Sequence, residues 1–201
     1  AIVVKDDPLA PDYVSRGAHK LAGALSAFEP LGLSVAGRRC LDAGASTGGF
    51  TDVLLRRDAA QVVAVDVGYG QLAWKLRQDP RVVVHDRTNV RELTPERIGG
   101  PVDVVVGDLS FISLTLVLPA LVPLLAPQGQ LLLLAKPQFE LQPGQVGKGG
   151  IVRDAALFPV VEQRLRDCCA QLGLQVLGWH GSAIEGGDGN REFFIHARRS
   201  A

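Results

Sequence analysis

The sequence lacks several features that would place it in a specialised class of protein. It contains no methionine, only 3 cysteines and 5% aromatic residues, and its 21 basic residues equal its 21 acidic ones. Because an odd number of cysteines provides no disulfide framework, the sequence favours a reducing, cytoplasmic location. A net charge of zero excludes a protein that holds nucleic acid by bulk charge alone.

Long hydrophobic runs are also absent. The most apolar stretches lie near residues 114–126 and 131–135, and the first is interrupted by Pro119 and Pro123. A helix that crosses a membrane needs about 20 apolar residues, so none is predicted, and no signal peptide is visible. The chain begins at Ala1 without methionine, so we expect it to be part of a longer protein.

What is present is enough apolar sequence for one sizeable core. Apolar residues make up 47% of the 201 residues, a length typical of a single compact domain. Residues 1–14 predict a linker or tail, and residues 15–201 the domain. Short apolar runs predict strands over residues 39–43, 61–66, 82–85, 102–107, 130–135, 174–180 and 192–197. A helix is predicted from an N-cap at Ser15 to about Phe28. Further helices are predicted over residues 49–57, 72–78, 114–125 and 155–172.

The alternation of these elements predicts the fold class. Continuous Val and Leu strands separated by helices are typical of a parallel sheet that is covered on both faces. The last two strands are joined by a glycine-rich loop without a helix, so they should be antiparallel, at one edge of the sheet. We therefore predict an α/β fold with a doubly wound, seven-stranded, mostly parallel sheet and one antiparallel edge strand.

A glycine-rich turn follows the first predicted strand, where such sheets bind ligands. It reads D-A-G-A-S-T-G-G-F over residues 42–50, and its spacing differs from the dinucleotide fingerprint and from a phosphate-binding P-loop. Asp42 in the turn suits a ligand with a positive or amino-bearing end. Asp66 follows the second strand, where a carboxylate can accept ribose hydroxyls. Together these features favour a nucleoside site over a merely tight turn with a capping aspartate.

Five motifs then carry a family resemblance. S-R-G-A-H-K-L, the glycine turn, V-D-V-G-Y-G-Q-L, D-L-S-F-I-S and K-P-Q-F-E resemble the TlyA family, over Val14 to His196. Its members are called haemolysins but act as S-adenosylmethionine-dependent 2′-O-methyltransferases of ribosomal RNA, and they belong to a wider FtsJ-like group. The resemblance implies a Rossmann-like methyltransferase fold, S-adenosylmethionine as cofactor, and ribosomal subunits as partners, with cytidine as the target. It also implies an S4-like RNA-binding domain ahead of this segment.

The resemblance further implies a Lys-Asp-Lys-Glu catalytic tetrad at Lys20, Asp108, Lys136 and Glu192. Asp108 and Lys136 directly follow the fourth and fifth predicted strands, so they should lie side by side. Lys136 follows L-L-L-L-A and precedes a proline, where a lysine needs a carboxylate partner. The alternatives are a snorkelling side chain for Lys136, a solvated helix residue for Lys20 and an ordinary cross-strand pair for Glu192.

The donor site implied by the resemblance lies over the glycine turn. Asp66 would hold the ribose, Asn89 would bond the adenine edge unless it is only a turn residue, and Val67 and Leu109 would sandwich the ring. No metal site is predicted. The full expected set is Asp42, Gly44, Ala45, Ser46, Thr47, Gly48, Gly49, Phe50, Asp66, Val67, Asn89, Asp108 and Leu109.

Other functions remain open from the sequence. Base amino-methyltransferases often have two prolines after the fourth strand, and D-L-S-F at residues 108–111 has neither. A membrane-active haemolysin would need a strongly cationic amphipathic helix, which the sequence does not show. An NAD-dependent oxidoreductase would need a different spacing of glycines in the turn. An RNA-binding module without catalysis is the last alternative. The candidate RNA contacts are Arg16, His19, Lys20, Lys148 and Arg153, and a neutral domain should hold RNA weakly.

Overall fold

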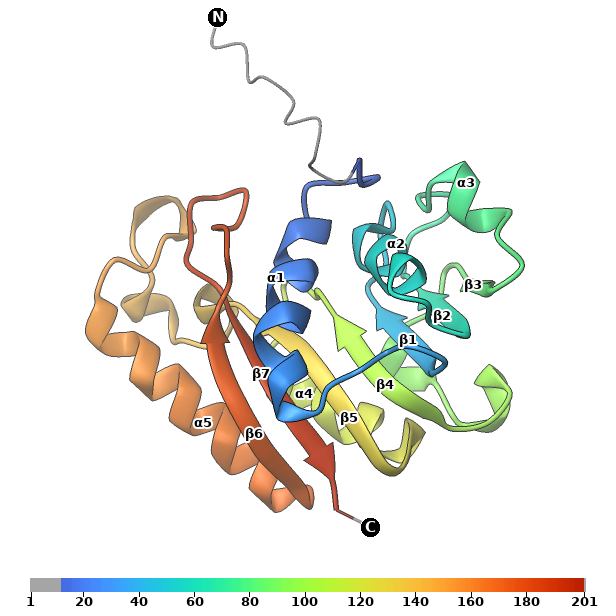
Figure 1. The fold of residues 1–201 in the computed structure, drawn as a ribbon. Helices are drawn as coiled ribbons and strands as arrows, with labels where there is room; N and C mark the ends of the chain where they lie inside the picture. The colour runs from blue at the N-terminus through green and yellow to red at the C-terminus, as the bar shows by residue number, and fades with distance from the viewer. Residues whose placement is uncertain (1–11, 201) are drawn as a thin grey trace, which may run out of the picture.

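A single sheet of seven strands runs through the molecule (Figure 1). The structure is a computed structural model that describes residues 12–200, so the predicted linker lies outside the described residues except for residues 12–14. The strand order is β3-β2-β1-β4-β5-β7-β6. The strands are β1 (Arg39–Ala43), β2 (Gln61–Val65), β3 (Val82–His85), β4 (Val102–Gly107), β5 (Leu125–Ala135), β6 (Leu174–Gly181) and β7 (Phe193–Arg199).

The sheet is mostly parallel, as predicted. Strands β1 to β5 pair in parallel, whereas β7 is antiparallel to both of its neighbours, β5 and β6. The predicted antiparallel pair thus forms one end of the sheet, with β6 outermost and β7 one place inside it. The order of the strands reverses between β1 and β4, which is where open α/β sheets bind their ligands.

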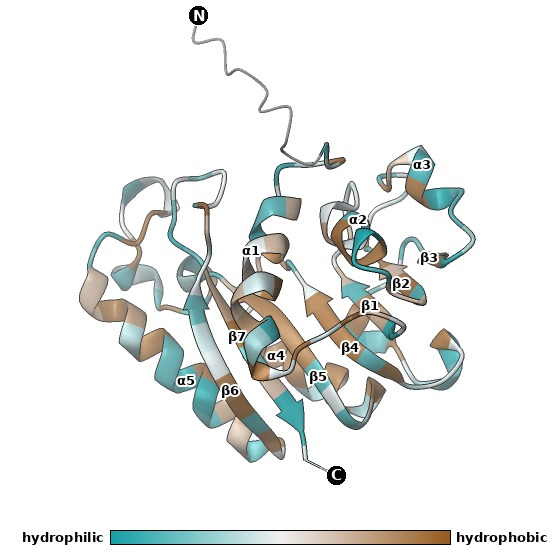
Figure 2. Ribbon diagram, in the orientation of Figure 1, coloured by the Kyte–Doolittle hydropathy of each residue, from teal (hydrophilic) through white to brown (hydrophobic). Residues whose placement is uncertain are grey.

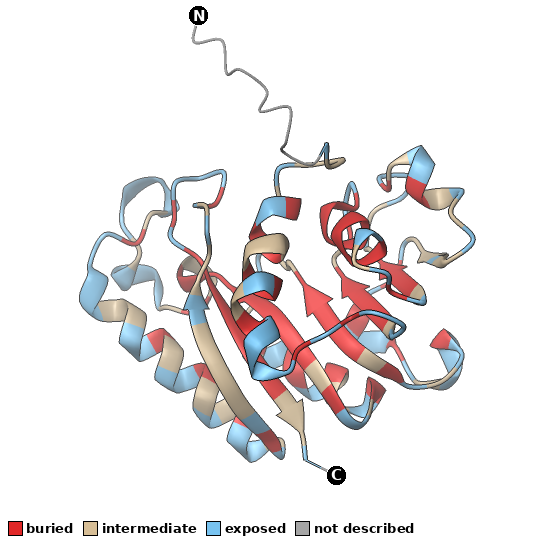
Figure 3. Cartoon of the chain, viewed as in Figure 1, coloured by how far each residue is buried: buried red, intermediate tan, exposed pale blue. Residues whose placement is uncertain are grey.

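Helices cover both faces of the sheet. They are α1 (Ala18–Phe28), α2 (Gly49–Arg56), α3 (Trp74–Arg77), α4 (Leu114–Leu121) and α5 (Phe158–Gln171). Buried residues of α1 and α2 pack on one face and those of α4 and α5 on the other. The central strands are apolar and buried, while α5 alternates between polar and apolar residues (Figures 2 and 3). The doubly wound arrangement is therefore confirmed.

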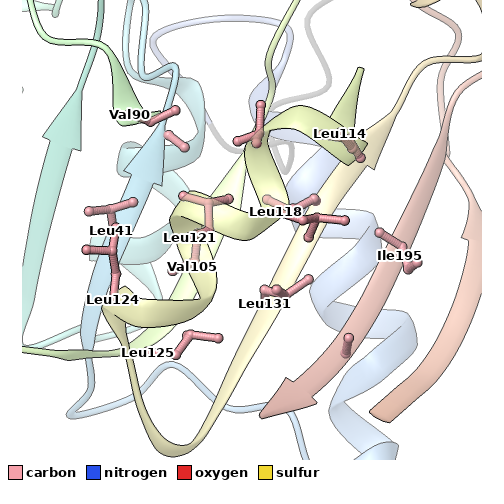
Figure 4. Packing of buried hydrophobic residues seen from close by; sticks show 14 of the residues in the cluster. Leu41, Val90, Val105, Leu114, Leu118, Leu121, Leu124, Leu125, Leu131 and Ile195 are labelled. Carbon is pink, nitrogen blue, oxygen red and sulfur yellow. The ribbon is translucent and has the colours of Figure 1, made fainter. Parts of the chain in front are cut away.

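The α4 helix shows how the core is built. Its leucines pack onto β1, β4 and β5, together with Ile195 of β7 (Figure 4). Burying a leucine side chain contributes about 1.5–3 kcal/mol, so this helix anchors the loop that precedes it. The helix is shorter than predicted: α4 contains Pro119 but ends at Leu121, and a 3₁₀ turn that contains Pro123, Val122–Leu124, continues the chain.

The opening helix begins later than predicted. Its N-cap is Gly17 and not Ser15. The Ser15 hydroxyl instead lies against Gly49 at the start of α2, where a side chain would have no room. Ser15 is therefore part of the carboxyl edge of the sheet and contributes to the site described next.

Candidate active site

The ends of β4 and β5 bring the first lysine–carboxylate pair together. Gly107 of β4 is in register with Leu133 of β5, and Asp108 and Lys136 follow these strands. Lys136 Nζ lies 2.5 Å from Asp108 Oδ1 and donates to Ser110 Oγ at 2.9 Å. Lys136 is only 9% exposed. The side chain therefore has a carboxylate partner and does not extend into solvent.

A second lysine–carboxylate pair lies between α1 and the end of the loop before β7. Lys20 Nζ is 2.6 Å from Glu192 Oε1, and both residues are buried. Glu192 directly precedes β7 and is not within it as predicted. The carboxylate packs against Gly186, where an added Cβ would lie 2.5 Å from Glu192 Oε2. Removing one partner of such a buried pair destabilises the protein strongly, because the other charge is left buried without a partner.

The register of the sheet places these two pairs next to each other. The last matched residues of the antiparallel β5–β7 ladder are Ala135 and Phe193. Lys136 follows the first and Glu192 precedes the second, so they stand opposite each other just past the end of the ladder. Opposed residues in antiparallel strands have Cβ atoms about 5 Å apart. The register thus puts the Lys136–Asp108 and Lys20–Glu192 pairs at the same end of the sheet.

The glycine turn after β1 closes against the Asp108 loop. Gly44 has a φ of +80°, and an added Cβ would lie 2.7 Å from the Asp108 carbonyl oxygen. The amides of Gly44 and Ala45 both donate to the Val65 carbonyl, at 2.9 and 3.0 Å. Because these amides are already used, the turn is a poor cradle for phosphate. The amide of Ser46 donates to Asp66 Oδ1 at 3.2 Å, which ties the turn to the end of β2.

Two adjoining hollows open at this edge. The first has a volume of about 370 Å³, and the second about 240 Å³. Of the expected donor residues, the first hollow is lined by Gly44, Ser46, Asp66, Val67, Asn89, Asp108 and Leu109. The second is lined by Gly44, Ala45, Ser46, Thr47, Gly49, Phe50 and Asp108, together with Lys136. Because Gly44, Ser46 and Asp108 line both, the two hollows adjoin at the glycine turn.

Four predicted residues line neither hollow: Asp42, Gly48, Lys20 and Glu192. Gly48 acts through its backbone, since its φ of +107° lets it cap α2. Lys20 and Glu192 form a buried ion pair with each other.

Asp42 is fully buried beneath the turn, and its Oδ2 accepts a hydrogen bond from Thr51 Oγ1 at 2.8 Å. Burial raises the pKa of Asp42 to about 7, a rise that the hydrogen bond from Thr51 opposes and the charges of Asp108 and Asp66 reinforce. Within residues 12–200, Asp42 Oδ1 has no hydrogen-bond partner.

Several residues that line the hollows were not predicted from the sequence. Ser110 touches both hollows and Lys136, and its position two residues after Asp108 in D-L-S-F was the available signal. Gln71, Thr88 and Ile112 also line the first hollow. Asn89 lines it too, while its Oδ1 accepts a hydrogen bond from the Arg91 amide at 3.0 Å. Asn89 is therefore a turn residue as well as a wall of the hollow.

The residues present fit S-adenosylmethionine. The first hollow is lined by two carboxylates, by apolar side chains and by no lysine or arginine, which suits a nucleoside and disfavours a phosphate. The charges of Asp66 and Asp108 also raise the pKa of Asp42, so three carboxylates lie close together around the turn. Such a negative environment favours a cationic ligand.

Comparisons with known proteins agree with this geometry. Residues 13–199 match the model of the FtsJ-like methyltransferase family. The chain is 58% identical, over 98% of its length and 71% of the relative's, to a Mycobacterium tuberculosis protein named 16S/23S rRNA (cytidine-2′-O)-methyltransferase TlyA.

Two solved structures show the same fold. One, from Streptococcus thermophilus and provisionally named a hemolysin, is 44% identical with a TM-score of 0.91, covering 95% of this chain and 68% of that one. The other, an S-adenosylmethionine-dependent methyltransferase from Mesorhizobium loti, is 13% identical with a TM-score of 0.62, covering 87% of this chain and 96% of that one. The chain belongs to the FtsJ-like methyltransferase family and uses S-adenosylmethionine as its methyl donor.

Proposed function

We propose that this chain transfers a methyl group to the ribose 2′-hydroxyl of a cytidine in ribosomal RNA. The observation that carries the proposal is the Lys136–Asp108 pair in the wall of the second hollow, with the Lys20–Glu192 pair beside it. The name of the Mycobacterium tuberculosis relative, a cytidine-2′-O-methyltransferase of 16S and 23S rRNA, supports this substrate.

The first hollow would hold the nucleoside part of the donor. Asp66 would accept the ribose hydroxyls, and Val67 and Leu109 would contact the ring, since all three line that hollow. When bound, S-adenosylmethionine supplies a methyl group on a positively charged sulfur, which leaves as a neutral sulfide. The chain must therefore align the acceptor oxygen and remove one proton. Alignment alone can lower a barrier by about 7–11 kcal/mol.

Lys136 would act on the acceptor hydroxyl. A ribose hydroxyl is a weak acid, so its oxygen needs help to become nucleophilic. The Lys136 ammonium, held by Asp108 and Ser110, would orient this oxygen and stabilise the negative charge that develops on it. As the new C–O bond forms and the methyl–sulfur bond breaks, the hydroxyl proton would pass to the Asp108 carboxylate. General acid–base assistance of this kind contributes about 10²–10⁴-fold to a rate.

The Lys20–Glu192 pair would position the ribose. Because the tetrad contains two lysines and two carboxylates, it is neutral overall, which limits the cost of burying it. Both members of this pair are almost inaccessible, so they would act from behind Lys136.

An exposed aromatic side chain beside the tetrad supports an RNA substrate. Phe111 is 90% exposed and has a φ of +62°, and its ring centroid lies 5.2 Å from that of Phe139. A bulky residue held at positive φ is strained, and exposing a phenylalanine is costly without a partner. Nucleic-acid bases stack on aromatic rings of this kind.

The rival functions lack comparable support. The D-L-S-F segment contains neither proline of the base amino-methyltransferases. No helix within residues 12–200 is long and apolar enough to cross a membrane.

The modified atom decides among these functions. We would incubate ribosomal subunits with labelled S-adenosylmethionine and the purified protein. Mass spectrometry of the digested RNA should find 2′-O-methylcytidine. A methyl group on a base nitrogen or carbon would contradict the proposal, and liposome leakage by the same preparation would favour the haemolysin alternative.

We also place the reaction in the cytoplasm, on ribosomal subunits. Cys40, Cys168 and Cys169 are free thiols. Burial raises the pKa of Cys40 and of Cys169 to about 12, so these two thiols are unreactive and fit a reducing compartment.

A further inference from the structure

Two loops carry the outer members of the tetrad. One follows β5, runs over residues 136–152 and begins with Lys136. The other joins β6 to β7 over residues 182–192 and ends with Glu192. Figure 1 shows them side by side beyond the carboxyl end of β5. Lys136 pairs with the Asp108 loop and Glu192 pairs with α1. The β5–β7 ladder sets the backbone spacing only as far as Ala135 and Phe193, so beyond its end a contact between the two loops is needed to keep them in place.

Asn190 supplies that contact. It is 1% exposed, and its Oδ1 accepts a hydrogen bond from the Val152 amide at 2.9 Å. Its Nδ2 donates to the Gly150 carbonyl at 2.9 Å and to Asp188 Oδ2 at 2.8 Å. The side-chain amide therefore pairs with the backbone of the neighbouring loop in both directions, as a strand would.

A second link leads from Asn190 towards Lys136. The Asn190 amide donates to Asp188 Oδ1 at 2.9 Å, and Asp188 Oδ2 accepts a hydrogen bond from Gln138 Nε2 at 3.1 Å. Gln138 is two residues after Lys136, and Asn190 is two residues before Glu192. A continuous path of hydrogen bonds thus connects the neighbours of the two tetrad residues.

We propose that Asn190 is a positioning residue for methyl transfer, whose side-chain amide ties the Lys136 loop to the Glu192 loop and so holds Lys136 and Glu192 in place beyond the end of the β5–β7 ladder. This inference rests on the proposed function. Asn190 lines neither donor hollow, so it affects the catalytic step and not donor binding. A displacement of about 1 Å at a reacting group can cost about 100-fold in rate.

The first test is Asn190→Ala, compared with Glu185→Ala. Glu185 is exposed in the same loop, so its substitution tests for a general effect of altering this loop. Asn190→Ala should lower kcat for methylation roughly 10- to 100-fold, while calorimetry finds an unchanged Kd for S-adenosylmethionine. Glu185→Ala should leave kcat and this Kd unchanged.

The Asn190→Asp variant tests the individual hydrogen bonds of Asn190. It keeps an acceptor for Val152 but loses the donor to Gly150 and places a second carboxylate against Asp188, so kcat should fall at least as far. Combining it with Asp188→Asn restores one amide–carboxylate hydrogen bond with the partners exchanged, and should recover part of kcat. A simple loss of folding would not show this recovery.

Gln138→Ala covers the case in which the Asn190 variants fold poorly. It removes only the outer hydrogen bond, so kcat should fall by a smaller factor with the melting temperature unchanged. Unchanged kcat in folded Asn190→Ala, or an equal loss of kcat and donor binding, would overturn the inference, as would an unchanged kcat in Gln138→Ala.

Hydrogen exchange separates this inference from the proposed function. Asn190→Ala should speed amide exchange in residues 148–152 and 182–192 together, and leave the glycine turn unchanged. If the wild-type protein makes no 2′-O-methylcytidine, the proposed function fails, whereas faster exchange in both loops still shows that Asn190 ties them. Unchanged exchange would refute the tie itself.

Discussion

Asp42 is a buried acid whose charge depends on its neighbours. Burial raises its pKa to about 7, and the nearby charges of Asp108 and Asp66 add to this rise. Near neutral pH the carboxyl group is therefore divided between its protonated and ionised forms. A cationic donor placed over the turn favours the ionised form, so donor binding and proton release at Asp42 should be coupled.

The first prediction concerns the pH dependence of donor binding. The affinity for S-adenosylmethionine should rise as pH increases from 6 to 8, because Asp42 loses its proton across this range. In Asp42→Asn the affinity should be weaker and nearly independent of pH. Isothermal titration calorimetry at pH 6, 7 and 8 measures both proteins. The same pH slope in the variant and the wild type would show that another group is responsible.

The second prediction concerns stability without the donor. The pKa of Asp42 in the folded state, about 7, lies above its ordinary value of 3.8, so the folded protein holds this proton more tightly than the unfolded chain. Its contribution to stability is present below about pH 4 and is lost as pH rises to 7. Asp42→Asn should therefore gain melting temperature relative to wild type between pH 5 and pH 8. A constant difference across that range would contradict the assigned pKa.

Some residues of the site could be predicted from the sequence alone, and others could not. Lys136 was identifiable because a lysine after four leucines and an alanine needs a carboxylate. Ser110, 26 residues away from Lys136, and Asn190, 38 residues away from Val152, were not singled out, since only the folded chain brings these partners together. Asp42 was expected at the ligand but lies beneath the turn, because an Asp inside a strand can point to either face.

At the level of elements, Glu140 fastens the Lys136 loop to α4. It is 3% exposed, and it accepts hydrogen bonds from Ser113 Oγ at 2.5 Å and from the Leu114 amide at 2.7 Å. Burial raises the pKa of Glu140 despite these bonds. The carboxylate satisfies amide and hydroxyl donors at the start of α4, and so holds the end of the loop that begins at Asp108.

The third prediction tests this fastening. Glu140→Ala should lower the free energy of unfolding by about 1–3 kcal/mol, since it leaves buried donors unsatisfied. Glu140→Gln keeps the size and one acceptor, so it should be less damaging. Urea denaturation measures both variants, with Glu185→Ala as an exposed control. Equal stability of Glu140→Ala and wild type would show that water replaces the carboxylate.

Most strands were predictable to within one or two residues because each is a continuous apolar run. The exception is β5, which begins at Leu125 instead of the expected residue 130. Leu125 pairs with Val102 before an irregularity in the ladder between Val102 and Val104, and a local pattern does not show such an interruption. The N-cap at Ser15 was wrong because Gly17 begins the helix while Ser15 packs on Gly49.

At the scale of the whole molecule, strand order assembles the site. Strands β1, β4, β5 and β7 lie in succession, so the glycine turn, Asp108, Lys136 and Glu192 meet at one edge although they span most of the chain. The parallel α/β pattern made the fold class and the ligand-binding edge predictable. The position of β7 between β5 and β6 was not, because two antiparallel strands give the same local pattern in either order.

The central claim is that Lys136 acts on the acceptor hydroxyl and does not merely support the donor site. Lys136→Ala should be studied beside Lys148→Ala, an exposed lysine in the same loop, by calorimetric titration with S-adenosylmethionine and by 2′-O-methylation of ribosomal subunits. Lys136→Ala should lose methylation by about 10²–10⁴-fold and keep nearly the wild-type donor affinity, while Lys148→Ala keeps its donor affinity. Loss of donor binding together with activity, or methylation that persists in Lys136→Ala, would contradict the account.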